Sequence, residues 1–190
     1  MTMLTFDEAT HTYCWDGKRV PGVTTILQAL HNFDGVPAGL LAIAQERGTA
    51  VHLACEYLDQ GMLDEDSIDP AIAGYVNAWR LFTAELTPIW SHIEARCFHK
   101  VMRYAGTVDR VGIINGKEYV LDIKTSIASH AVWGLQTAAY AHALEKERAF
   151  RATVQLRIDG TYRLIEWDDK SDWPTFISLI TINNFLEKHK

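Results

Sequence analysis

Residues 106–126 read GTVDRVGIINGKEYVLDIKTS, a stretch that sets two aspartates and a lysine inside an otherwise apolar β-hairpin. Asn115-Gly116 is the strongest short-range hairpin signal, because a type I′ turn needs positive φ at both central residues. A two-residue loop fixes the register of the two strands. Counting back along both of them places Asp109 directly opposite Asp122.

Two carboxylates opposite each other in a hairpin repel, since their Cβ atoms are roughly 4.5–5.5 Å apart. Strand alternation adds Lys124 to the face that carries Asp122. A divalent cation would hold the acids together, and Mg²⁺ typically binds one or two carboxylates, several waters and the phosphate oxygens of a substrate. In the alternative, these three side chains form the solvated face of a half-buried sheet. A one-residue error in the loop would exchange the two faces.

The composition predicts one domain, residues 1–190, with a sizeable core, because 48% of the residues are hydrophobic and 22% are charged. No apolar run is long enough to span a bilayer, and the first residues lack the pattern of a secretory signal. Cys14, Cys55 and Cys97 are far apart and form neither a metal-type pair nor a disulfide framework. We therefore expect a cytoplasmic protein without a membrane partner.

The net charge of −6 argues against a protein that coats nucleic acid through bulk electrostatics. It leaves room for an enzyme that binds nucleic acid locally through metal ions. Residues 146–163 are mostly basic and could follow a phosphate backbone. The same residues fit equally well as a solvated helix end and an edge strand.

The order of the expected elements predicts an α/β domain with a mixed sheet flanked by helices. A short hairpin is expected around Asp16-Gly17. Helices are expected over 38–60, with a break near Gly48, and over 70–86, with Pro70 in the first turn. The remaining expected elements are a strand over 91–99, the 106–126 hairpin, a helix over 130–147, strands over 150–158 and 161–167, and a helix over 172–188.

Further candidate site residues lie on the expected helices and just after the hairpin. His52 and Glu56 are one helical turn apart, as are Gln136 and Tyr140. Either pair fits as packing residues with a polar tip. Thr125 and Ser126 could cap a turn or contact phosphate.

The chemistry that suits the hairpin acids is metal-assisted phosphodiester hydrolysis. Asp109 and Asp122 would hold one or two divalent ions, which activate a water and stabilise the leaving oxygen. Lys124 could orient the attacking water or neutralise the developing negative charge. With a lowered pKa it could instead act as a base.

Four short motifs occur in order along the chain: R-G-T-A-V-H (47–52), G-T-V-D (106–109), V-L-D-I-K-T-S (120–126) and Q-x-x-x-Y (136–140). Together they resemble the PD-(D/E)XK nuclease superfamily. The likeness is greatest to its RecB-like exonuclease branch, which includes Cas4-type nucleases, phage recombination exonucleases and the mitochondrial genome maintenance exonuclease. The resemblance extends over about residues 11–145 and implies a restriction-endonuclease-like core.

The resemblance implies roles for most of the candidates. Asp109 and Asp122 would be metal ligands, together with the Ile123 carbonyl and His52, and Lys124 would be the catalytic lysine. Gln136 and Tyr140 would support the site or the DNA, and Glu94 would be an accessory acid. The positions of the other candidates suggest a second accessory acid, Glu56, and two supporting or DNA-binding residues, Thr125 and Ser126. The cofactor would be Mg²⁺ or Mn²⁺. The cysteines that bind an iron–sulfur cluster in Cas4-type proteins are missing, so no cluster is expected.

The leading hypothesis is a Mg²⁺- or Mn²⁺-dependent DNA exonuclease of a phage or prophage, acting in recombination or repair in a bacterial or phage-infected host cell. Its expected partners are DNA, a single-strand annealing or single-strand-binding protein, and further copies of itself. Two alternatives remain open. One is a structure-specific or restriction-type endonuclease, and the other is a catalytically inactive DNA-binding recombination module.

Overall fold

The structure is a computed structural model that describes residues 3–8, 10–30 and 37–189. Its elements in chain order are β1 (Leu4–Asp7), β2 (Thr12–Trp15), β3 (Lys18–Val20), α1 (Val23–Leu27), η1 (Gln28–Leu30), α2 (Ala38–Asp59), η2 (Glu65–Ser67), α3 (Pro70–Leu86), β4 (Ile89–His99), β5 (Tyr104–Ile114), β6 (Lys117–Lys124), α4 (Val132–Ala143), β7 (Phe150–Leu156), β8 (Tyr162–Glu166) and α5 (Asp172–Lys188).

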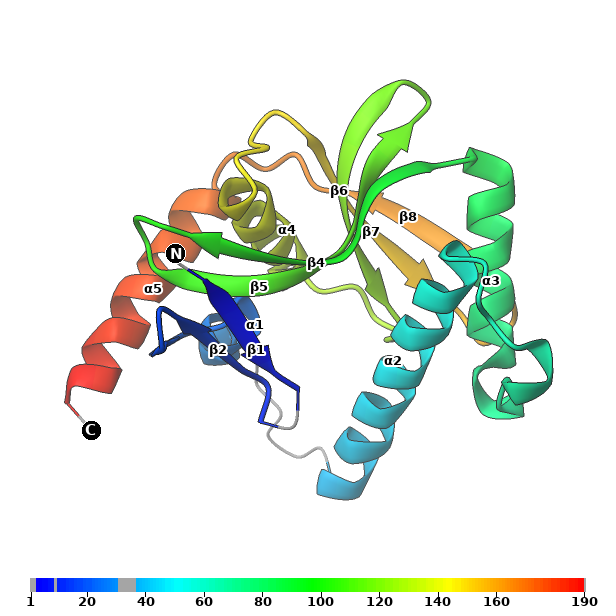
Figure 1. Ribbon diagram of the computed structural model, residues 1–190, viewed down its shortest axis with the longest axis horizontal. Helices are drawn as coiled ribbons and strands as arrows, with labels where there is room; N and C mark the ends of the chain where they lie inside the picture. Colours follow the sequence, from blue (N-terminus) through cyan, green and yellow to red (C-terminus); the bar gives the residue numbers. More distant parts are fainter. Residues whose placement is uncertain (1–2, 9, 31–36, 190) are drawn as a thin grey trace.

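The central sheet has the order β4-β5-β6-β7-β8. Strands β6 and β7 pair in parallel and the other neighbours are antiparallel, so the sheet is mixed. One apolar cluster joins the sheet to α2 and α3, and a second joins it to α1, α4 and α5. Figure 1 shows these helix groups on either side of the strands. The predicted α/β class, a central mixed sheet flanked by helices, is confirmed.

The hairpin that the sequence predicted is present. Asn115 and Gly116 have φ of 49° and 75°, as a type I′ turn requires, and the ladder runs from Ile114–Lys117 to Arg110–Leu121. The ladder ends one position before the two aspartates. There the Ile123 N–H donates to the Asp109 carboxylate at 2.5 Å instead of to a backbone carbonyl. The predicted register is therefore correct from the turn to the Arg110–Leu121 pair. Beyond that pair, the Asp109 side chain connects the two strands.

The two long helices before β4 follow their predicted bounds closely. Helix α3 begins at Pro70, and the Asp69 side chain caps it by accepting from the Ala71 N–H at 2.8 Å. The break expected near Gly48 is wrong, because α2 is continuous from Ala38 to Asp59. Gly48 sits where a Cβ would meet only Thr125 Oγ1 at 3.9 Å, so a single glycine at this point does not interrupt the helix. None of the helices in the described ranges is long and apolar enough to cross a membrane.

A separate three-stranded sheet, β1-β2-β3, lies beside β4 and β5 (Figure 1). The hairpin at Asp16-Gly17 within it was predicted, whereas β1 was not. This N-terminal sheet is joined to β5 by a parallel bridge between Gly22 and Ala105 and by a small apolar cluster that contains Tyr13. The joint places the turn after β1 and the start of α1 over one side of the central sheet.

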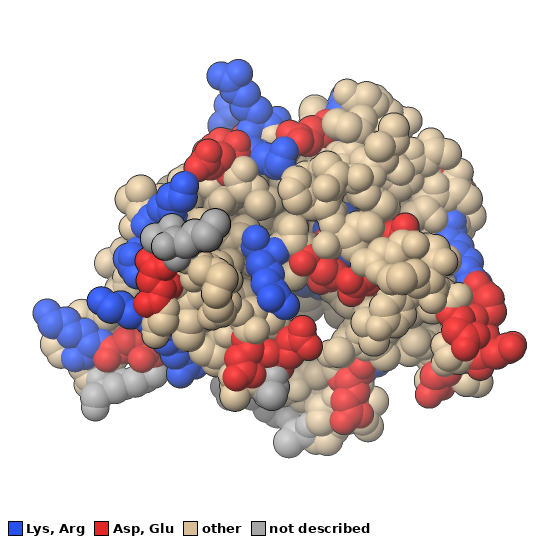
Figure 2. Space-filling model, in the orientation of Figure 1, with Lys and Arg blue, Asp and Glu red and all other residues tan. Residues whose placement is uncertain are grey.

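Exposed charge is unevenly spread over the face shown in Figure 2. Acidic side chains gather at its right margin, over the segment that links α2 to α3. The exposed acids of that segment are Asp64, Glu65, Asp66 and Asp69. These acids therefore form a surface feature of the linking segment.

Gly74 allows α3 to contact the turn between β7 and β8. A Cβ at this position would lie 1.8 Å from the Ile158 carbonyl oxygen, a backbone atom that cannot move by itself. We expect Gly74→Ala to lower the free energy of unfolding by about 1–3 kcal/mol, because one side of the contact must shift. Urea unfolding followed by circular dichroism would measure the change.

Gly39→Ala is the matched control, since Gly39 is also helical and a Cβ there would meet nothing within 4 Å. It should leave the stability unchanged or raise it by up to about 1 kcal/mol. Equal stability of the two variants would show that the contact at Ile158 does not need glycine.

Candidate active site

A cavity of about 350 Å³ lies between α2, the strands β4–β6, α4 and the N-terminal sheet. We call it the acidic cavity. Its charged or ionisable lining includes His52, Glu94, Asp109, Asp122 and Lys124. The cavity therefore brings together side chains that are up to 72 positions apart in the sequence, from His52 to Lys124.

Three of these residues form a group that could hold a metal ion. One ligand atom each from His52, Glu94 and Asp109 lies within 4.8 Å of the other two. Glu94 was expected only as an accessory acid, yet it belongs to this group. Asp122 lines the same cavity without being a member of the group.

Glu94 reaches the cavity through an irregular stretch of β4. The register of β4 against β5 shifts between Trp90 and His92, and Glu94 has a φ of 48°. A positive φ is costly for a residue with a long side chain and persists only where its surroundings enforce it. We infer that this strain directs the carboxylate toward Asp109, because Ile93 and Ala95 on either side pair regularly with β5.

Arg110 fixes the Glu94 carboxylate from the opposite face of β5. Its Nη1 donates to Glu94 Oε1 at 3.0 Å and to the Asp109 carbonyl at 2.6 Å, and its Nε donates to Asp59 Oδ2 at 2.6 Å. The guanidinium is fully buried and lies over the Trp79 ring. Arg110 was not among the site residues predicted from the sequence. The available signal was an arginine between the valines of GTVDRVG, which must be buried with partners if the strand is central.

Asp122 and Lys124 form the second part of the cavity. Lys124 Nζ lies 2.6 Å from Asp122 Oδ2, as expected from strand alternation. This oxygen is buried and has no partner in hydrogen-bond geometry. Burial raises the pKa of Asp122 to about 6, although the Lys124 charge acts in the opposite direction. A buried carboxylate oxygen that faces an ammonium without a well-directed hydrogen bond is suited to a cation or a proton.

His52 contacts two other candidate residues. Its Nε2 lies 3.0 Å from the Ile123 carbonyl, and its Nδ1 lies 3.5 Å from Asp109 Oδ1. Burial lowers the pKa of His52, but the Asp109 carboxylate outweighs burial and raises it to about 9. The Ile123 carbonyl, expected to be a metal ligand, is therefore a hydrogen-bond acceptor of the protonated imidazole in this structure.

The pKa of Glu94 is raised to about 7, first by burial and then by the charge of Asp109. The pKa of Asp109 is lowered, because the charges of His52 and Lys124 together with the Ile123 N–H outweigh its burial. The set combines carboxylate oxygens with one imidazole, which suits Mg²⁺ or Mn²⁺. A bound cation would relieve the repulsion between the acids, so these residues fit the expected cofactor.

The remaining candidates divide into those that line the cavity and those that do not. Gln136 and Tyr140 line it, and the Gln136 amide donates to the Tyr140 hydroxyl at 3.0 Å. Thr125 and Ser126 do not line it, and the Ser126 hydroxyl donates to the Ala128 carbonyl at 3.2 Å. Glu56 does not line it either, and its carboxylate accepts from the Gln60 amide at 3.1 Å.

Several lining residues were not predicted at all. His11, Tyr13, Val23 and Thr24 come from the N-terminal sheet and α1, and Thr107 comes from β5. The Tyr13 hydroxyl lies 2.9 Å from Thr107 Oγ1. Nothing in the sequence near these residues indicated that the N-terminal sheet would cover the acids.

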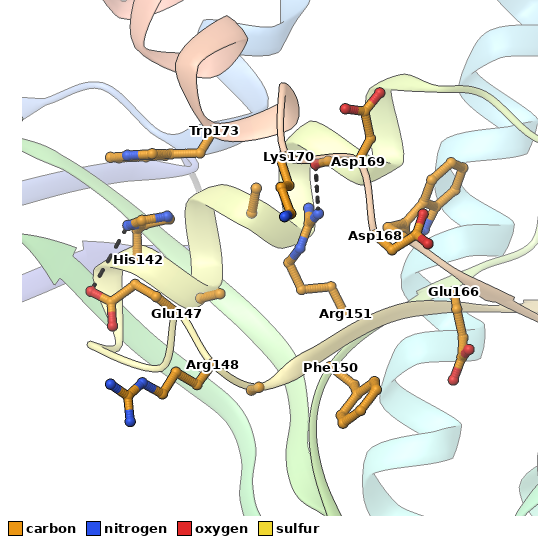
Figure 3. A pocket seen from close by; sticks show the side chains of 14 residues that line it. His142, Glu147, Arg148, Phe150, Arg151, Glu166, Asp168, Asp169, Lys170 and Trp173 are labelled. Atoms are coloured by element: carbon orange, nitrogen blue, oxygen red, sulfur yellow. Dashed lines mark hydrogen bonds and ion pairs between the residues drawn. The ribbon is translucent and has the colours of Figure 1, made fainter.

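A larger hollow of about 560 Å³ lies between α4, β7 and the segment after β8 (Figure 3). The His142 ring stacks on Trp173 at 3.8 Å, and Arg151 pairs with Asp172 at 2.9 Å. The metal-type group found in the described part of the chain lies elsewhere, in the acidic cavity. We therefore take the acidic cavity as the candidate site.

Comparison with known proteins gives only distant structural likenesses. No family model matches the sequence, and no curated protein matches it. A crystal structure of SSO0001 is similar with a TM-score of 0.41 and 18% identity, over 73% of this chain and 70% of that one. The alkaline exonuclease LHK-Exo of Laribacter hongkongensis is similar with a TM-score of 0.35 and 14% identity, over 88% and 91% of the two chains. Its complex with dAMP gives a TM-score of 0.33 and 14% identity, over 90% and 92%.

Glu94→Gln is expected to weaken Mn²⁺ binding about ten-fold or more, because it removes one anionic ligand from the group and keeps the shape of the side chain. The Gln oxygen can still accept from Arg110, which makes a structural effect small. Isothermal titration calorimetry would measure the affinity. Glu56→Gln is the matched control and should bind Mn²⁺ as the unaltered protein does, since Glu56 does not line the cavity. An equal loss in both variants would exclude Glu94 as a specific ligand.

Mn²⁺ binding is expected to strengthen as the pH rises. A metal ligand must be deprotonated, and the pKa of His52 at about 9 means that its imidazole carries a proton at neutral pH. Binding must therefore release that proton, and the apparent affinity should rise between about pH 6 and about pH 9. Calorimetry in two buffers with different ionisation enthalpies counts the protons released. No proton release at about pH 7 would contradict His52 as a ligand.

Proposed function

We propose that this protein is a Mg²⁺- or Mn²⁺-dependent DNA exonuclease. The supporting observation is that one cavity holds three carboxylates, a histidine and a lysine, and that ligand atoms of His52, Glu94 and Asp109 lie within 4.8 Å of one another, close enough to share a divalent cation. The four motifs that resemble RecB-like PD-(D/E)XK nucleases supply these residues, apart from Glu94. A binding module without catalysis would have no use for buried acids that repel each other.

In the proposed site, His52, Glu94 and Asp109 hold the cation, and Asp122 faces it across the cavity. A bound Mg²⁺ or Mn²⁺ supplies a Lewis acid that lowers the pKa of a water and neutralises phosphate charge. Arg110 keeps the Glu94 carboxylate in place. Gln136 and Tyr140 form a buried polar wall whose hydroxyl and amide can contact a phosphate or the attacking water.

Lys124 is the proposed catalytic residue that acts on the phosphate. Its side chain is 23% exposed and its Nζ lies beside Asp122, so the amine borders both the acids and the cavity. From there it can orient the attacking water or stabilise the negative charge that develops on the phosphate. Its contact with Asp122 restricts its position before substrate enters.

The biological setting follows from the motif resemblance and is part of the proposal. The protein would act in recombination or repair of phage or prophage DNA, in the cytoplasm of a bacterial or infected cell. A single-strand annealing or single-strand-binding protein would be its partner, and it could work as a homo-oligomer. A structure-specific or restriction-type endonuclease would use the same residues, and closed circular DNA separates the two, because an exonuclease leaves circles intact.

Lys124→Ala is expected to reduce metal-dependent loss of end-labelled linear DNA about 10²-fold or more, because it removes a group that acts in the transition state. Lys117→Ala is the matched control. Lys117 lies on the same strand as Lys124, and its Nζ is 4.6 Å from the centre of the Phe150 ring, outside the cavity. Lys117→Ala should digest DNA at the normal rate.

The assay includes linear single-stranded, linear double-stranded and closed circular DNA, each with Mg²⁺, Mn²⁺ or EDTA. Digestion that persists in Lys124→Ala or in EDTA would contradict the proposed mechanism. Cut circles would favour the endonuclease. Folded protein that binds DNA but cuts none of it with either metal would favour the inactive module.

A further inference from the structure

We propose that an apolar hollow beside the acidic cavity receives unpaired bases, and that the substrate strand is therefore single-stranded. The hollow has a volume of about 720 Å³ and lies between α1, η1 and the segment that leads into α4. Its apolar wall includes Leu27, Leu30, Val132 and Trp133. This inference rests on the proposed function and adds the class of nucleic acid to it.

The apolar hollow and the acidic cavity adjoin each other. Thr24, Lys124 and Gln136 line both of them. A phosphate beside Lys124 would therefore have its own base, or that of the next nucleotide, within reach of the hollow. The hollow is also about twice as large as the cavity, at 720 Å³ against 350 Å³.

The wall of the hollow offers contacts that suit a base. Leu30 is 50% exposed, and the exposed His130 ring lies in a T-shaped arrangement with Trp133, with 5.6 Å between the ring centroids. Both side chains are therefore accessible to a base that enters the hollow. Aromatic and apolar side chains beside a backbone-binding groove are how single strands are bound without regard to sequence.

The depth of the acids argues against a duplex at this site. The Asp122 side chain is 2% exposed and the Asp109 side chain 8% exposed, and His11 and Tyr13 of the N-terminal sheet line the cavity above them. A duplex presents its phosphates on a wide, stiff cylinder that cannot enter a cavity of this size. A single strand can rotate one phosphate inward and place its base in the hollow.

The overall charge leads to the same conclusion. With a net charge of −6 the protein repels a polyanion at long range, so affinity must come from the cation and from short-range contacts. The hollow supplies such contacts only to bases that are not already stacked in a duplex.

The test measures binding by fluorescence anisotropy, with the full-length protein in Ca²⁺ and a gel to show that each oligonucleotide stays intact. The probes are a labelled thymidine strand, an abasic strand of equal length and charge, and a blunt duplex. We expect the thymidine strand to bind about five-fold more tightly, or better, than either of the other two. Equal or tighter binding of the duplex or the abasic strand would overturn the inference.

The double variant Leu30→Ser/His130→Ser should lose that preference, because it removes the exposed part of the apolar wall. Leu186→Ser/His189→Ser is the matched control, since Leu186 is 53% exposed and lies on α5 outside the hollow. The control should keep the preference. Loss in both pairs, or in neither, would overturn the inference.

Digestion with Mn²⁺ separates the two proposals. Digestion of DNA without a preference for unpaired bases would leave the nuclease standing and exclude base docking in the hollow. A preference that depends on Leu30 and His130, without digestion in Mg²⁺ or Mn²⁺, would leave the docking site standing and exclude the nuclease.

Discussion

The candidate site depends on the contacts that the buried guanidinium of Arg110 makes with its neighbours. It joins the end of α2, through Asp59, to Glu94 on β4 and to the backbone of β5. Removing a charge from water costs several kcal/mol, so a buried arginine persists only when carboxylates and hydrogen bonds compensate for it. Asp59 and Glu94 supply most of that compensation, and the contact with Arg110 holds the Glu94 carboxylate near Asp109.

Two neighbouring residues of strand β5 thus face opposite sides of the sheet. Asp109 points into the acidic cavity and Arg110 points into the core that holds α2 and α3. The four carboxylates Asp59, Glu94, Asp109 and Asp122 are balanced by three basic groups, Arg110, His52 and Lys124. One negative charge remains when His52 is protonated, and two remain when it is neutral. Without a cation the centre therefore keeps excess negative charge, which adds to burial, the main cause of the raised pKa values of Glu94 and Asp122.

The features that depend on local sequence signals could be predicted from the sequence. Asn115-Gly116 fixed the hairpin and its register, and Asp69-Pro70 fixed the start of α3. The place of Glu94 depends on a register shift near Trp90 and on a positive φ, which no propensity encodes. Arg110 and the cover formed by the N-terminal sheet depend on contacts between distant segments. Periodicity can show which face a residue occupies, but it cannot show which helix will cover that face.

Because Arg110 is buried, salt should affect the structure around it much less than it affects binding to a phosphate backbone. Salt screens exposed charges beyond about 8 Å at physiological concentration but acts little on pairs without solvent access. The Arg110 network should therefore keep its geometry in concentrated salt, whereas contacts between the cavity rim and a phosphate backbone weaken as counterions compete. The candidate site would therefore stay assembled at salt concentrations that weaken the binding of a nucleic acid, so loss of binding in salt would not imply loss of structure.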